Sequence, residues 1–210
     1  MKTYFFLCGF LFFTLATYAQ KKAVTETGEE VILYDDGTWK YANDSTKEEV
    51  TISTNSKIFK KSTNATFLVK SIKSNTGIWI NTKKWSFKKG VSNEDAEYEF
   101  ELKDKDLYGM MITERIEIPL EALKKAALEN AKTAAPDIKI IKQEYRNVND
   151  KKILMLQMNG TADGIKFSYF GYYFSNAKGT VQLVTYTSQG LFNEMMNEAE
   201  ELLNGLVTVE

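Results

Sequence analysis

The pattern of hydrophobic and polar positions divides the chain into four parts of different character. An apolar leader covers residues 1–19, an aromatic segment 20–41, a polar stretch 42–65, and a long region of alternating and periodic patterns 66–210. The last region has the length of a common globular domain and can bury a core of its own. We therefore expect a leader, a small β-ribbon, a polar linker and one main domain.

Alternation of apolar and polar positions predicts strands in the main domain. In residues 97–102, three glutamates alternate with three apolar side chains, which is typical of a strand with one face in the core and one in water. Residues 165–175 carry large aromatic side chains on both faces and predict a central strand that is covered on both sides. Further strands are expected around 67–69, 77–80, 85–87, 107–118, 138–145, 152–158 and 180–187.

Two segments have the period of an amphipathic helix. Pro119 suits the start of a helix, because the N–H that proline lacks would have no partner there, and apolar residues recur at helical spacing from Leu120 to Ala134. Near the C-terminus, Ser188 can cap a second helix whose apolar stripe runs to Leu206. The order of elements predicts an α+β protein with an antiparallel sheet and flanking helices, arranged as an α/β/α sandwich or a two-layer plate.

Residues 20–41 predict a small β-ribbon with an aromatic face. Asp36-Gly37 lies between two apolar segments and is typical of a two-residue hairpin turn, which would place Tyr34 opposite Trp39 and Ile32 opposite Tyr41. A ribbon of this size is marginally stable alone. Its aromatic face is therefore expected to pack on the rest of the chain or on a partner, and the sequence leaves both possibilities open.

The leader has the features of a secretory signal peptide. Lys2 precedes an uncharged stretch from Tyr4 to Leu15, and small residues precede an expected cleavage site after Ala19. The stretch is shorter than the roughly 20 residues of a membrane-spanning helix, and Cys8 lies within it rather than at a lipidation boundary. We expect a periplasmic or secreted protein with no transmembrane anchor after cleavage.

Loss of the leader narrows the chemistry that the composition allows. The chain has no histidine and its one cysteine lies in the leader, so the mature chain would lack imidazole, thiol and disulfide groups. It would carry 26 basic and 28 acidic residues, a net charge of −2, with Arg115 and Arg146 as its arginines. This balance disfavours binding to nucleic acid, and the missing histidines and cysteines disfavour zinc.

No motif identifies a catalytic site, a metal site or a cofactor. Ser86 and Lys89 match the Ser-x-x-Lys spacing of penicillin-recognising enzymes, but those enzymes place the serine at a helix start, whereas this pair lies in a strand-like segment. Glu99, Glu101, Glu114 and Glu117 are candidates for a carboxylate-dependent hydrolase, although alternation places Glu99 and Glu101 on a solvent face. We therefore expect no catalytic residue, no metal and no cofactor.

Part of the pattern resembles known proteins. The segment Gly77-Ile78-Trp79-Ile80, Trp85, the helix after Pro119, the aromatic hairpin 167–186 and the terminal amphipathic helix are similar to the PsbP/Mog1-like fold. The resemblance implies an accessory or binding protein without catalytic residues. The ribbon, with its core Asp35-Asp36-Gly37-Thr38-Trp39, also resembles segments near the mature start of exported bacterial proteins.

Two groups of aromatic residues are candidate binding sites. In the main domain, a groove for a ligand or partner is expected beside Trp79, Trp85 and Tyr172, although filling of the core would also explain them. The ribbon offers a second group, namely Tyr34, Trp39 and Tyr41. The leading hypothesis is a non-catalytic exported accessory or binding protein of the cell envelope that contacts an envelope or secreted protein. The alternatives are a carrier of a small apolar ligand in an aromatic groove and a carboxylate-dependent hydrolase.

Overall fold

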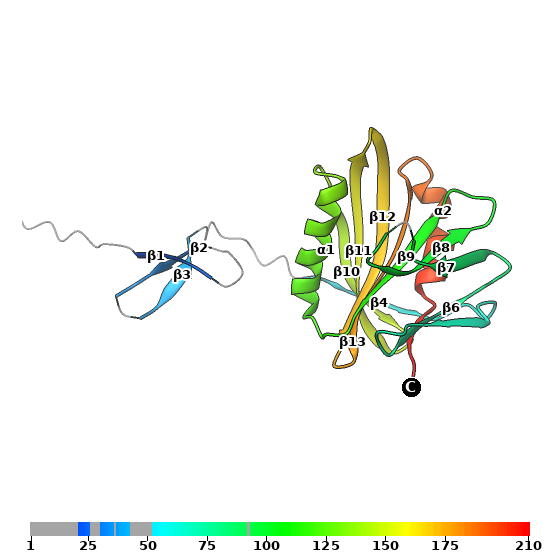
Figure 1. The fold of residues 1–210 in the computed structure, drawn as a ribbon, viewed down its shortest axis with the longest axis horizontal. Helices are drawn as coiled ribbons and strands as arrows, with labels where there is room; N and C mark the ends of the chain where they lie inside the picture. Colours follow the sequence, from blue (N-terminus) through cyan, green and yellow to red (C-terminus); the bar gives the residue numbers. More distant parts are fainter. Residues whose placement is uncertain (1–20, 26–29, 36, 43–51, 92) are drawn as a thin grey trace, which may run out of the picture. The chain divides into compact units, whose positions relative to one another are not determined.

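A computed structural model describes residues 21–25, 30–35, 37–42, 52–91 and 93–210 of the chain. The chain forms two compact units, Met1–Thr51 and Ile52–Glu210 (Figure 1). The expected signal peptide lies outside the described residues, as do residues 43–51 of the expected linker. Within the described ranges, no helix is both long and apolar enough to cross a membrane.

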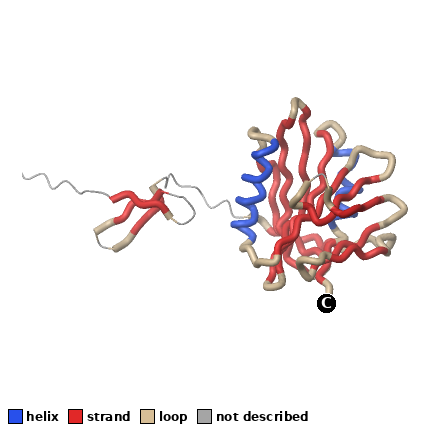
Figure 2. Tube along the Cα trace, in the orientation of Figure 1, coloured by secondary structure: helices blue, strands red, loops and turns tan. Residues whose placement is uncertain are grey.

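The first unit contains a three-stranded antiparallel meander. Its strands are β1 (Lys21–Val24), β2 (Glu30–Leu33) and β3 (Trp39–Tyr41), in the order β1-β2-β3 (Figure 2). Strand β1 pairs along the whole of β2. The meander confirms the expected N-terminal ribbon.

The register of the β2–β3 hairpin differs by one residue from the prediction. Leu33 lies opposite Trp39 and Val31 lies opposite Tyr41, and the Tyr34 N–H donates a 2.9 Å hydrogen bond to the Thr38 carbonyl. The connection is therefore a three-residue loop, in which Gly37 adopts φ +83°, as such loops require. A one-residue shift moves side chains to the other face, so Tyr34 does not join Trp39 and Tyr41.

The second unit is built on an eight-stranded sheet with the order β4-β10-β11-β12-β13-β9-β8-β7. All neighbours are antiparallel except β4 and β10, which are parallel. The strands are β4 (Thr54–Phe59), β7 (Trp85–Lys89), β8 (Ala96–Leu102), β9 (Tyr108–Glu114), β10 (Lys139–Val148), β11 (Lys151–Ala162), β12 (Ile165–Asn176) and β13 (Gly179–Ser188). A smaller antiparallel sheet has the order β14-β6-β5, with β5 (Phe67–Lys70), β6 (Thr76–Ile80) and β14 (Leu206–Thr208).

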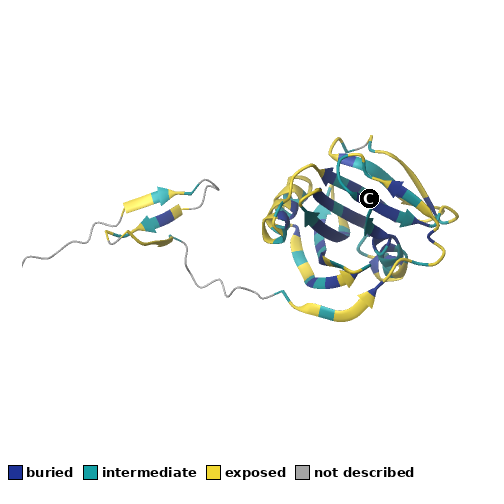
Figure 3. Cartoon of the chain, turned by 90° about the horizontal axis from the view of Figure 1, so that it is seen from below, coloured by how far each residue is buried: buried dark blue, intermediate teal, exposed yellow. Residues whose placement is uncertain are grey.

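Two helices cover opposite faces of the large sheet, which confirms the predicted α+β class. Helix α1 (Leu120–Ala134) packs on one face through Leu123 and Ala127. Helix α2 (Phe192–Leu203) and the small sheet pack on the other face. Strand β12 contributes Tyr173 to the first core and Tyr172 to the second, so it is the central strand that its two-sided aromatic pattern predicted. Buried strands accordingly run through the middle of the unit in Figure 3.

The expected linker is wrong for residues 54–59, because β4 is part of the large sheet. It pairs with β10, where Asn147 lies opposite Ile58 and Val148 opposite Phe59. Phe59 is buried in the core on the α2 side, while most other residues of β4 are exposed. A polar edge strand that is held by one large side chain has the composition of a loop, which is why the sequence predicted a linker here. Because β4 belongs to the large sheet, the second unit starts at Ile52 rather than at residue 66.

The C-terminal helix also starts later and ends earlier than predicted. Ser188 ends β13 and its carbonyl accepts a hydrogen bond from the Leu191 N–H at 3.1 Å. Helix α2 begins at Phe192 without a side-chain cap and ends at Leu203. Leu206, expected in the helix, instead pairs with Ile78 in the small sheet. Glycine at position 205 allows this pairing, because the chain passes so close to the Trp79 carbonyl there that no side chain would fit.

Candidate partner-binding surfaces

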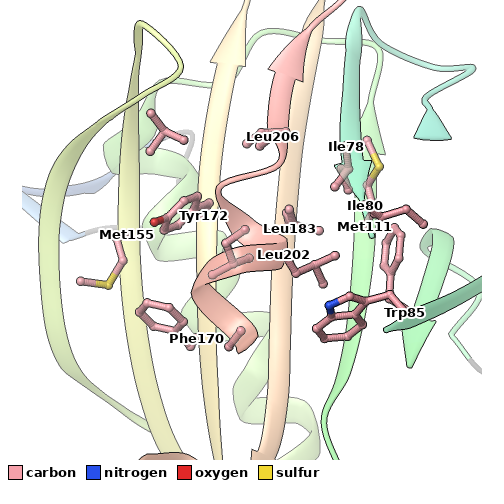
Figure 4. Close-up of a cluster of buried hydrophobic side chains, with 14 of the residues drawn as sticks. Ile78, Ile80, Trp85, Met111, Met155, Phe170, Tyr172, Leu183, Leu202 and Leu206 are labelled. Carbon is pink, nitrogen blue, oxygen red and sulfur yellow. The ribbon is translucent and has the colours of Figure 1, made fainter. Parts of the chain in front are cut away.

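Two of the predicted surface aromatics, Trp85 and Tyr172, belong to the core. Trp85 is 2% exposed and Tyr172 is fully buried. Figure 4 shows both among Phe170, Leu183 and Leu202, between the large sheet and helix α2. They fill space in the core, which was the other explanation for their presence, and they present no surface to a ligand or a partner in this conformation.

Trp79 lies apart from that core. It is half-buried on β6, between the buried Ile78 and Ile80, so its side chain leaves the small sheet on the opposite face. The ammonium group of Lys61 lies 5.0 Å from the centroid of its ring, which is within the range of a cation–π contact. Trp79 and Trp85 therefore do not flank a common groove.

The aromatic face of the ribbon is exposed. Trp39 is 54% exposed and Tyr41 is 44% exposed, and their rings contact edge to face with centroids 5.3 Å apart. Leu33 lies opposite Trp39 on the same face. Tyr34 lies elsewhere, with the Lys40 ammonium 5.7 Å from its ring centroid. Of the three predicted ribbon residues, the structure thus brings together Trp39 and Tyr41.

A buried ionic network surrounds Arg146 on β10. Its Nε donates to Glu144 Oε1 at 2.6 Å, and its Nη1 donates to the Tyr172 hydroxyl at 2.8 Å and to Glu200 Oε1 at 2.7 Å. The Tyr172 hydroxyl in turn donates to Asn204 Oδ1 at 3.0 Å. The sequence analysis did not predict this network, which joins β10, β12 and α2.

The electrostatics of this network favour permanent ion pairs. Burial by itself raises the pKa of the Glu144 carboxyl, but hydrogen bonds from Asn55 and Arg146 and the charges of Arg146 and Lys142 outweigh it, so the pKa lies below its usual value. Burial lowers the pKa of Arg146, and the Tyr172 hydroxyl and Glu144 outweigh that effect. Burial raises the pKa of Tyr172. Glutamate and arginine therefore stay charged and paired, which suits a structural role rather than proton transfer.

The carboxylates of β8 are less exposed than alternation predicted. Glu97 accepts hydrogen bonds from the Ser71 hydroxyl at 2.7 Å, from the Ile72 N–H at 2.6 Å and from Thr113. The side chain of Glu99 is 14% exposed and lies 3.2 Å from the Lys88 ammonium. Glu99 also accepts hydrogen bonds from the Val91 N–H at 2.9 Å and the Asn93 N–H at 3.2 Å, so both carboxylates hold neighbouring loops.

Two of the candidate hydrolase carboxylates, Glu99 and Glu114, lie far apart. Glu99 is opposite Met110, which precedes Glu114 by four residues along β9, a separation of roughly 13 Å at the rise of a strand. The carboxyl groups of glycosidases lie within about 9.5 Å of each other. The strand positions therefore give no support to these two residues as a catalytic pair.

A shallow hollow and the acidic residues are further candidate sites. The hollow, of about 220 Å³, is open to solvent and bordered mainly by lysines, including Lys84, which binds Glu198 and Glu201 at 2.8 Å each. Among the described residues, no three carboxylate, imidazole or thiol groups are grouped in a way that could hold a metal ion. Neither feature offers an apolar cavity or a cation cage.

A group of half-buried tyrosines on the large sheet was not foreseen. Tyr108 on β9 and Tyr186 on β13 stack with ring centroids 5.6 Å apart, and Tyr169 on β12 meets Tyr186 edge to face at 5.9 Å. All three residues lie in predicted strands, but the pattern of a single strand does not show that they are neighbours. A tyrosine at a corresponding position of three successive strands is the signal that would have found them.

Comparison with solved structures identifies the fold of the main domain. No protein-family model and no curated protein matches the sequence. The cyanobacterial PsbP (CyanoP) of Synechocystis sp. PCC 6803 superposes with a TM-score of 0.51 at 10% identity, over 68% of this chain and 91% of that protein. A protein of unknown function from Pseudomonas aeruginosa has a TM-score of 0.44 at 12% identity, over 69% of this chain and 97% of that protein. LpqN of Mycobacterium tuberculosis, which is involved in cell envelope biogenesis, has a TM-score of 0.37 at 9% identity, over 72% of this chain and 82% of that protein. Because these two TM-scores lie below 0.5, the fold is assigned from CyanoP alone. The main domain of this chain therefore has a PsbP-like fold.

Proposed function

We propose that the chain is a non-catalytic accessory protein, exported to the cell envelope, that binds a protein partner through the aromatic face of its N-terminal ribbon. The observation that carries the proposal is the exposure of Trp39 and Tyr41 side by side on one face of the meander. Tryptophan and tyrosine are enriched where proteins bind one another. In this proposal residues 1–19 act as a signal peptide that directs export of the protein and is cleaved after Ala19.

The size of the ribbon supports a docking role. Its strands comprise only four, four and three residues, too few to bury a core, and an isolated ribbon of this kind is marginally stable in water. Covering the face that carries Leu33, Trp39 and Tyr41 would remove apolar surface from water and stabilise the ribbon. The opposite face carries Lys22 and Lys40 and is suited to remain in solvent.

The contacts of the main domain also support a binding role over catalysis. Its most buried charges, Arg146 and Glu144, are held in ion pairs. Two of its candidate hydrolase carboxylates, Glu99 and Glu114, lie on distant strand positions. The alternative of a small-ligand carrier has less support, because Trp85 and Tyr172 are packed in the core. Native mass spectrometry of the purified protein tests the carrier directly: a retained mass of a small apolar molecule would favour it over the accessory role.

A capture experiment with matched variants tests the proposal. Tagged full-length protein with Trp39→Ala and Tyr41→Ala is compared with a control carrying Lys22→Ala and Lys40→Ala on the opposite face. Loss of two interface aromatics is expected to lower recovery of a specific envelope protein at least about tenfold, while the lysine control recovers it like the unaltered protein. Equal recovery by both variants, or no protein enriched by the unaltered chain, would overturn the proposal.

A further inference from the structure

Four side chains form a straight row across the large sheet, on the face that α1 covers in part. Glu101 on β8 is opposite Tyr108, Tyr108 is opposite Tyr186, and Tyr186 is opposite Tyr169. Directly opposite residues share a face and their side chains touch, so three tyrosines and a glutamate stand next to one another on four successive strands. The row continues under the helix, where Tyr169 is opposite Met158.

Helix α1 covers only one end of this row. Met158 and Tyr169 pack in the apolar cluster beneath the helix, whereas Tyr186 and Tyr108 take no part in the clusters under either helix. In the described part of the chain, β9 makes its main contacts with β8 and β13. The two outer tyrosines are accordingly half-buried, and their rings contact each other.

Two carboxylates, those of Glu101 and Asp106, lie near Tyr108 at the uncovered end of the row. Glu101 is exposed and, among the described residues, its carboxylate has no ion-pair partner. The Asp106 carboxylate lies 3.5 Å from the Tyr108 hydroxyl, and the nearby Glu99 is balanced by Lys88. Burial, the Asp106 charge and the Glu101 charge all raise the pKa of Tyr108. Burial, Tyr169, Glu99, Tyr108 and Glu101 raise the pKa of Tyr186, which agrees with carboxylates close to both rings.

We propose that this row is a second binding surface, which accepts a basic extended segment of a partner protein. The apolar stem of a lysine or arginine side chain fits along the tyrosine rings, and its charged head fits at Glu101 and Asp106. Charge complementarity of this kind selects a partner and guides its approach. The surface belongs to the PsbP-like domain and does not depend on the role proposed for the ribbon.

The arrangement of the rings favours a side chain over a sugar. Tyr108 and Tyr186 are inclined by only 27° and stack on each other, so each ring covers a face of its neighbour. Tyr169 stands at 82° to Tyr186. Sugars pack on broad, open ring faces, whereas rings that stack on each other suit a narrow stem that ends in a hydrogen-bond donor.

Titration with three probes tests this surface. The purified full chain is titrated with an alternating arginine–valine octapeptide, with the corresponding glutamate–valine peptide and with chitohexaose, and backbone amide NMR shifts are followed. We expect saturable binding of the basic peptide alone, weakened by added salt, with the largest shifts at Tyr108, Tyr186 and Glu101. Saturable binding of chitohexaose at the row, or no saturable binding of the basic peptide, would overturn the proposal.

Charge-matched variants locate the site. Glu101→Lys should weaken binding of the basic peptide at least about tenfold, since it replaces attraction by repulsion. Glu129→Lys makes the same charge change on the exposed side of α1 and should leave the affinity within about twofold. Tyr108→Ser, checked for an unchanged fold by its amide spectrum, should also weaken binding. Equal affinities for the Glu101 and Glu129 variants would contradict the assignment.

Discussion

The ring of Phe59 on β4 covers the guanidinium group of Arg146 on β10, with the carbon at the centre of that group 4.3 Å from the ring centroid. This contact attaches a polar edge strand to the core, because Phe59 is the one buried residue of β4. The same guanidinium reaches β12 through Tyr172 and α2 through Glu200. Phe59 and Arg146 thus link the edge of the sheet to the helix behind it.

The first prediction concerns Phe59. Replacing it by alanine is expected to lower the free energy of unfolding by about 3–5 kcal/mol, the usual range for a buried phenylalanine, and to release β4 from β10. Ile58→Ala on the same strand is the control, because Ile58 is 60% exposed. A substitution at such a surface position usually changes the free energy of unfolding by less than about 0.5 kcal/mol. Urea denaturation measures both. Similar midpoints for the two variants would show that β4 is not anchored through Phe59.

A second prediction concerns Arg146. Arg146→Ala should destabilise the protein by about 3–5 kcal/mol, because it leaves the buried Glu144 carboxylate without its main partner. Arg146→Met combined with Glu144→Gln should recover part of this loss by removing both charges. Arg115→Ala, at an exposed position, serves as the control and should be nearly neutral. If the double variant is less stable than Arg146→Ala, the unpaired carboxylate is not the source of the loss.

The pH dependence of stability provides a third prediction. The pKa of Glu144 is lower in the folded protein than in the unfolded chain, so the unfolded state binds more protons as the solution becomes acidic. The stability that Glu144 contributes is present above its unfolded pKa of about 4.3 and is lost as pH falls through the folded pKa. Glu144→Gln should therefore give a shallower fall in unfolding free energy below about pH 5. A slope identical to that of the unaltered protein would exclude this contribution.

Tryptophan fluorescence gives a fourth prediction, since the three tryptophans lie in different environments. Trp39 is exposed and Trp85 is buried, while Trp79 is half-buried. Acrylamide should quench Trp39 most strongly, so Trp39→Phe is expected to remove most of the readily quenched emission. Trp85→Phe should instead remove the blue-shifted, protected emission. A protected Trp39 in the purified protein would show that the aromatic face of the ribbon is already covered.

The sequence predicts much of the fold because most elements carry a strong periodic signal. The two-sided aromatic pattern of β12 correctly predicts a central strand, and the alternation in β8 correctly predicts its buried face with Phe100 and Leu102. Strand β4 could not be recognised, because one buried phenylalanine in a polar segment does not produce an alternation of apolar and polar residues. The ribbon register could not be fixed either, since Asp-Gly is compatible with loops of two or three residues.

Candidate sites are harder to predict because they depend on which side chains the topology brings together. Aromatic content alone did not distinguish Trp85, which fills the core, from Trp39, which is exposed. The tyrosine row depends on the registers of three strand pairs, involving Tyr108, Tyr186 and Tyr169, and no local pattern contains that information. The Arg146 network likewise joins residues that lie far apart in the sequence, such as Glu144 and Glu200.

Site-specific photo-crosslinking in the producing cells tests the proposed function most directly. A photoreactive phenylalanine analogue is placed at Trp39, on the aromatic face of the ribbon, or at Lys40, on the opposite face. The proposal predicts that the Trp39 position forms an adduct with one defined envelope protein and that the Lys40 position forms far less of it. Adducts within the chain alone, or equal yields from the two positions, would contradict the proposal that this face binds a partner.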